Sequence, residues 1–255
     1  MMKFAKEMIS STSSNSNSNI SRALGALDGT LVHAVVPANQ LIMYRGRGKG
    51  KCYQNVLGIC DFNMIFTYVY AGWEGLAHDA RVLTEIVSNP DNDFPFPPPN
   101  KYYLCDVAYP NTRGFLAPYR NVRSWLGDYH LRRAINEEKF NHGHAQLINI
   151  IARAYGVLKP RFPLLDKMPP YSIDVQRDIV IACFAAHNFI RKERINDDLF
   201  NQYDSPQLIL DKEEGEHEEV LDETNGPGWT TADSQIMSNM REELALQLMQ
   251  RRGNT

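Results

Sequence analysis

The sequence predicts an α/β domain in which helices flank a mixed β-sheet. Apolar runs rich in β-branched and aromatic residues lie at 52–60 and 65–71, and the four residues between them, which include Asp61 and Asn63, suit a hairpin turn. Strand and helix patterns then alternate as far as residue 191. A hairpin followed by strand–helix alternation is typical of an α/β domain with a mixed sheet.

Each early element follows from a local pattern. Residues 23–36 are apolar and predict a first strand, broken near Gly29 with Asp28 close to the break. Residues 74–87 carry apolar side chains at helical spacing and predict a helix. Three successive prolines make residues 94–100 a loop, because proline fits neither a helix interior nor a central strand.

The rest of the predicted fold is mainly helical. The remaining elements are a short buried strand at residues 102–105, ending at Asp106, and helices at residues 143–158, 173–191 and 238–251. Residues 179–186 are apolar on all sides of their helix, so we expect that stretch to be buried.

The composition divides the chain into three segments. Residues 1–22 contain a Ser/Asn-rich run that cannot bury enough apolar surface to fold, and we expect disorder there. Residues 23–198 form the expected folded domain, and residues 199–255 an acidic linker with a short C-terminal helix. No run of eighteen apolar residues occurs, so we expect no membrane-spanning segment and no membrane partner.

The net charge of −3 conceals an asymmetry. Residues 211–223 carry eight acidic side chains and one lysine, whereas residues 1–210 carry 23 basic and 19 acidic side chains. A mildly basic body suits a DNA-binding groove but is weak evidence by itself. The four cysteines form no Cys-x-x-Cys pair, which indicates buried, reduced thiols in an intracellular protein.

Three segments carry the functional signal: residues 25–30 around Asp28, residues 103–111 around Asp106, and residues 149–159. Together they resemble the DDE endonuclease domain of PIF/Harbinger-type transposases and of host genes descended from them. The similar segments extend over about residues 24–194. The resemblance implies an RNase H-like fold.

The resemblance also implies a two-metal endonuclease that holds Mg²⁺ or Mn²⁺ through three acidic residues. Asp28 and Asp106 match the first two acidic positions, but Ala152 occupies the position of the third, a glutamate. Alanine has no lone pair for a cation, so we expect a metal-dependent DNA endonuclease domain with impaired cleavage. The alternative is a non-catalytic descendant that binds DNA or a protein. From the residues alone, an aspartate beside a strand is more often a turn or capping residue than a metal ligand.

Four other carboxylates could compensate for Ala152. Glu137 and Glu138 would lie about 21 Å away on a continuous helix, so they could substitute only if the helix starts late and the preceding segment folds back. Asp61 lies in the predicted hairpin turn, where aspartate is favoured by turn chemistry alone. For Asp79 we expect a structural salt bridge with a neighbouring arginine.

Basic residues alternate with glycine at residues 44–51, a pattern that can bring charge and backbone close to phosphates. A solvated, flexible loop is the alternative. The candidate phosphate contacts are Arg45, Arg47, Lys49, Lys51, Lys159 and Arg161. The scattered histidines and cysteines form no zinc-ligand pattern, and no glycine-rich loop for nucleotide hydrolysis is present.

The family resemblance implies DNA as the partner and the nucleus as the location. Transposases of this type work with a separate Myb-like DNA-binding protein, which we expect here as a second partner. The N-terminal helical region usual in the family is missing from this sequence, so we expect a truncated copy.

Overall fold

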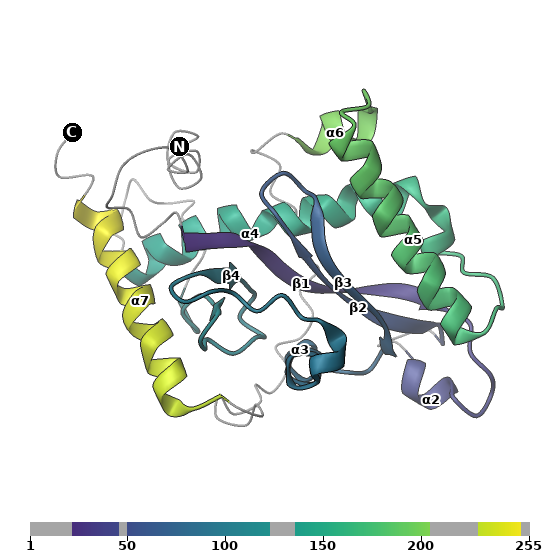
Figure 1. Cartoon of the computed structure of the whole chain (residues 1–255), viewed down its shortest axis with the longest axis horizontal. Helices are drawn as coiled ribbons and strands as arrows, with labels where there is room; N and C mark the ends of the chain where they lie inside the picture. The colour runs from purple at the N-terminus through teal and green to yellow at the C-terminus, as the bar shows by residue number, and fades with distance from the viewer. Residues whose placement is uncertain (1–21, 46–49, 123–135, 205–228, 251–255) are drawn as a thin grey trace. The chain divides into compact units, whose positions relative to one another are not determined.

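The computed structural model describes residues 22–45, 50–122, 136–204 and 229–250 (Figure 1). The expected disordered segment, apart from its last residue, and the acidic run at residues 211–223 lie outside the described residues. The strands are β1 (Ala23–Ala34), β2 (Cys52–Cys60), β3 (Phe66–Glu74), β4 (Tyr102–Leu104) and β5 (Phe115–Leu116). The helices are α2 (Leu41–Tyr44), α3 (Asp79–Ser88), α4 (Asn136–Arg161), α5 (Ile173–Lys192), α6 (Asp198–Tyr203) and α7 (Thr231–Gln250), with short 3-10 turns η2 (Pro90–Asn92) and η3 (Pro163–Leu165).

The strands form one five-stranded mixed sheet in the order β3-β2-β1-β4-β5. β2 and β3 form the predicted antiparallel hairpin, whereas β4 runs parallel to both β1 and β5. This flanked mixed sheet confirms the predicted α/β class and is consistent with an RNase H-like fold. No helix in the described ranges is long and apolar enough to cross a membrane.

The described residues fall into two compact units. The first contains residues 22–26, 96–122, 136–149 and 229–250, and therefore carries Asp106. The second contains residues 27–45, 50–95 and 150–204, and therefore carries Asp28 and Ala152.

In the second unit, α5 lies alongside β3 (Figure 1) and fixes the strands with two side-chain amides. Asn188 accepts a hydrogen bond from Phe66 N at 2.8 Å and donates one to Phe66 O at 2.7 Å. Gln176, which is fully buried, makes the same pair of bonds to Val35, at 3.0 and 2.6 Å. Each amide therefore satisfies both backbone polar groups of one residue, Phe66 at the start of β3 and Val35 just after β1, as a neighbouring strand would.

In the first unit, α7 packs against β5. Its buried face consists of Met237, Met240, Leu244, Ala245 and Leu248. Arg241 donates hydrogen bonds to Ala117 O at 3.2 Å and Pro118 O at 3.1 Å, and its guanidinium lies 4.2 Å from the Tyr119 ring centroid. The C-terminal helix is therefore part of the folded core of this unit.

Two sequence-based boundaries near the hairpin are wrong. β1 is continuous through Gly29, where a strand break was expected. The predicted helix at residues 74–87 begins only at Asp79, because β3 continues to Glu74. Gly72 adopts a φ of +101°, a left-handed conformation that lets the longer strand absorb an irregular register against β2.

Further differences concern the helices. α4 starts seven residues before the predicted boundary, with Glu137 and Glu138 in a first turn where the helix dipole favours acids. α5 is not buried on all sides, since Ile181 is 43% exposed. α6 lies in the segment predicted as linker; Asp197 caps it by accepting a hydrogen bond from Phe200 N at 3.1 Å. α7 begins at Thr231 rather than at residue 238.

Candidate functional site

Asp28 lies within β1 and is buried, with 6% of its surface exposed. The hydroxyl of Tyr155, on α4, donates a hydrogen bond to the Asp28 carbonyl oxygen at 2.9 Å. The backbone of Gly58, in β2, also hydrogen-bonds that hydroxyl. Within the second unit, β1, β2 and the later part of α4 therefore meet at Asp28.

The surroundings of two glycines show which face of the sheet Asp28 occupies. A side chain at Gly58 would collide with Tyr155 of α4, whereas a Cβ at Gly29 would lie 2.5 Å from Asp79 Oδ1 of α3. Successive side chains of a strand point to opposite faces. Because Asp28 is next to Gly29, its side chain points to the face covered by α4.

Ala152 is half-buried and lies on α4, three positions before Tyr155. Residues three apart on a helix are neighbours on its surface. Position 152 therefore lies on the side of α4 that contacts Asp28. Sequence reasoning missed Tyr155, because its hydrogen bond links residues 127 positions apart; its spacing from Ala152 was the available signal.

Asp106 follows β4 in the first unit and is half-buried. Its carboxylate accepts a hydrogen bond from Val107 N at 2.7 Å, and its carbonyl accepts one from Tyr109 N at 3.0 Å. It therefore begins a turn directly after a buried strand. Ala26 of β1 pairs with Leu104 of β4 in parallel register, and Asp28 and Asp106 each follow one member of this pair by two residues.

The structure argues against Glu137, Glu138 and Asp61 as substitutes for the glutamate that is missing at position 152. α4 is one continuous helix from Asn136, so Glu137 and Glu138 remain about 21 Å from position 152 along its axis. Asp61 accepts hydrogen bonds from Asn63 N at 2.8 Å and Ile65 N at 3.0 Å, the turn role expected for it.

Asp79 lies against Gly29, the neighbour of Asp28 in β1, and strand alternation places the Asp28 side chain on the other face of the sheet. Asp79 Oδ1 accepts a hydrogen bond from Asn55 Nδ2 at 2.8 Å, which ties the start of α3 to β2. The neighbouring Arg81 pairs with Glu85, at 2.8 Å.

The donors fit a hard divalent cation in kind but not in number. Aspartate oxygens are the ligands that Mg²⁺ and Mn²⁺ prefer, and both ligands predicted from the sequence, Asp28 and Asp106, are aspartates. Among the described residues, however, no three His, Cys, Asp or Glu side chains gather closely enough to hold a metal ion.

The candidate phosphate contacts differ in their surroundings. Arg45, Lys51 and Lys159 are exposed, and Arg47 and Lys49 lie outside the described residues. Arg161 forms an ion pair with Asp197, which holds the pKa of that carboxyl below its usual range. The Arg161 guanidinium also lies 5.5 Å from the Phe200 ring centroid, so it fastens α6 to α4.

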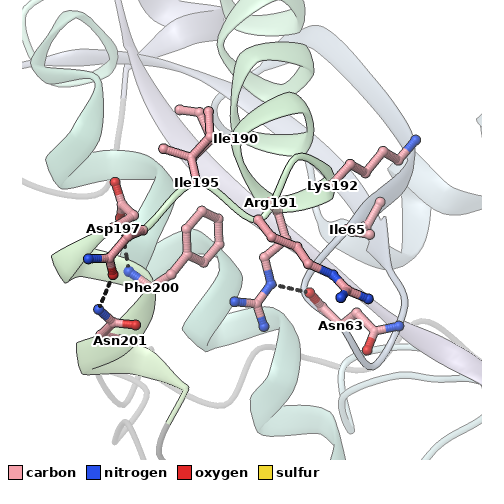
Figure 2. A pocket seen from close by; sticks show the side chains of 11 residues that line it. Asn63, Ile65, Ile190, Arg191, Lys192, Ile195, Asp197, Phe200 and Asn201 are labelled. Carbon is pink, nitrogen blue, oxygen red and sulfur yellow. Dashed lines mark hydrogen bonds between the residues drawn. The ribbon is translucent and has the colours of Figure 1, made fainter.

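A cavity of about 620 Å³ in the second unit lies between the β2–β3 turn, the end of α5 and α6 (Figure 2). Arg191 donates a hydrogen bond to Asn63 O at 2.9 Å and forms a two-bond ion pair with Asp204. Its guanidinium lies 4.8 Å from the ring centroid of Phe200, which lines the cavity. Neither Asp28 nor Ala152 lines this cavity.

His187, on α5, makes the stability of the second unit depend on pH. Burial lowers the pKa of His187 to about 4, and Nε2 donates a hydrogen bond to Met64 O at 2.9 Å. The unfolded chain, with a pKa of about 6.5, then binds the proton more readily. The stabilisation from neutral His187 is therefore complete above about pH 6.5 and is lost as the pH falls towards 4.

We expect His187→Gln to flatten this dependence. Between about pH 6.5 and 4, the slope of the unfolding free energy against pH should fall by up to about 1.4 kcal/mol per pH unit. Urea denaturation at a series of pH values measures it. His78→Gln, at an exposed position, is the control. Equal slopes in His187→Gln and the unaltered chain would contradict the assignment.

Comparison with protein families identifies the part of the chain that holds these residues. Residues 27–188 match a family described as DDE superfamily endonuclease. That range covers more than half of the chain and contains Asp28, Asp106 and Ala152. No curated protein and no solved structure matches the chain.

Proposed function

Because the chain belongs to the DDE superfamily endonucleases, we propose that it is a transposase-derived, metal-dependent DNA endonuclease domain of PIF/Harbinger type. We propose further that Ala152 impairs its cleavage of DNA. The observation that carries this proposal is the 27–188 match, which includes both aspartates and the alanine. Membership of the family implies a DNA substrate. A Myb-like DNA-binding partner and a nuclear location belong to the proposal.

In this proposal, Asp28 and Asp106 hold Mg²⁺ or Mn²⁺. Metal ions held there would supply activation of the attacking water and stabilisation of the leaving oxygen. The hydrogen bond from Tyr155 to its carbonyl oxygen holds Asp28 in place, and Asp106 begins the turn after β4.

The phosphate backbone of DNA is the proposed partner of the exposed cations. Arg45, Lys51 and Lys159 are exposed, whereas Arg161 is half-buried and forms an ion pair with Asp197. Contacts to phosphate release counterions, so affinity should fall steeply with added salt.

Impaired cleavage follows from the donor count. A site with two carboxylates lacks one ligand and one of the negative charges that offset two cations. A non-catalytic DNA- or protein-binding role is the second candidate, favoured by the same alanine.

A plasmid-nicking assay in Mn²⁺, combined with a DNA-binding titration at several salt concentrations, tests the proposal. We expect salt-dependent DNA binding, and nicking by the unaltered chain no faster than by Asp28→Asn. If the unaltered chain nicks DNA and Asp28→Asn abolishes nicking, another residue supplies the third ligand. Absence of DNA binding at low salt would contradict the assigned substrate.

A further inference from the structure

Tyr155 connects α4 to the backbone of Asp28. Its hydroxyl donates to the Asp28 carbonyl oxygen at 2.9 Å and hydrogen-bonds the backbone of Gly58. A carbonyl oxygen can only accept, so the bond requires the hydroxyl proton. The same hydroxyl therefore links the helix that carries position 152 to both strands at Asp28.

The site around this hydroxyl is closely fitted. Tyr155 is 7% exposed, and its ring centroid lies 5.4 Å from that of Phe66 and 6.3 Å from that of Phe184. Gly58 leaves the space that the hydroxyl fills, since any side chain there would collide with it. The ring therefore has a fixed direction, and the hydroxyl a fixed place.

We propose that Tyr155 is a positioning residue: it holds Asp28 in alignment with position 152 of α4. This inference rests on the proposed function, because it assigns Asp28 to a metal site. In the family pattern, the glutamate at position 152 and Asp28 would share cations. In this chain, Tyr155 holds α4 and β1 together without that shared ligand.

The test compares the Mn²⁺ affinity of the Ala152→Glu variant with that of the same variant carrying Tyr155→Phe as well. The affinity is measured from the paramagnetic resonance signal of free Mn²⁺. We expect affinity to fall about tenfold, the lower end of the loss typical when a partner that orients a ligand is removed. Tyr68→Phe is the matched control, because Tyr68 also donates to a backbone carbonyl, that of Asn92, at 3.0 Å. Its affinity should equal that of the Ala152→Glu parent.

Each outcome decides a different point. If the Ala152→Glu protein binds Mn²⁺ no better than the same protein with Asp28→Asn, the proposed metal site is wrong and the inference falls with it. If that parent binds Mn²⁺ and Tyr155→Phe binds it equally well, only the positioning role is overturned. Urea denaturation of both phenylalanine variants separates lost stability from lost affinity: a destabilised Tyr155→Phe with parental affinity would make Tyr155 purely structural.

Discussion

Replacing Ala152 with glutamate is expected to raise the rate of Mn²⁺-dependent plasmid nicking by on the order of 10²–10³-fold. Stabilisation of the transition state by a metal ion is worth several kcal/mol, and each ~1.4 kcal/mol corresponds to a factor of ten in rate. Position 152 lies on the side of α4 that contacts Asp28, and Tyr155 holds that helix in place. The new carboxylate would therefore reach the face to which Asp28 points.

Ala152→Gln is the matched control for this gain. Glutamine has the size of glutamate but not its charge, so it should restore little or no nicking. Adding Asp28→Asn to the glutamate variant should abolish the gain. Equal nicking by the glutamine and glutamate variants would mean that bulk at position 152, and not a metal ligand, had been missing.

Leu244→Ala is expected to lower the free energy of unfolding by about 2–5 kcal/mol, the cost of deleting a fully buried leucine side chain. Leu244 is 3% exposed on the face of α7 that packs against β5. Because α7 belongs to the unit that carries Asp106, the loss should appear in that unit although residue 244 lies outside the family match.

Leu246→Ala, on the same helix, is the control. Leu246 is 53% exposed, so its truncation should change stability by less than about 0.5 kcal/mol. Urea denaturation of the two variants, followed by circular dichroism, makes the comparison. Equal losses would show that α7 does not contribute its buried face to this core.

Elements with a long periodic pattern could be predicted from the sequence, and so could the short buried strand β4, whereas β5 and α6 could not. The helix predicted at residues 173–191 is α5, one residue longer, because its pattern extends over five turns. β5 has two residues and exists through its pairing with β4, so no local pattern identifies it. α6 has six residues, and its one local signal was the capping Asp197.

The candidate site divides in the same way. Asp28 and Ala152 could be found from flanking residues that resemble the family. The face that each side chain occupies could not, because it depends on contacts such as those of Gly29 with Asp79 and of Gly58 with Tyr155. Such contacts bring together residues far apart in the sequence, and only the fold determines them.

The amide of Asn188 also has a consequence for solubility. β3 is one of the two edge strands of the sheet, and an edge strand offers unpaired backbone groups to other chains. By bonding both the N–H and the C=O of Phe66, Asn188 occupies the first position at which a foreign strand could attach. We infer that α5 protects this edge from intermolecular strand addition, so that the hairpin can remain at the margin of the sheet without promoting aggregation.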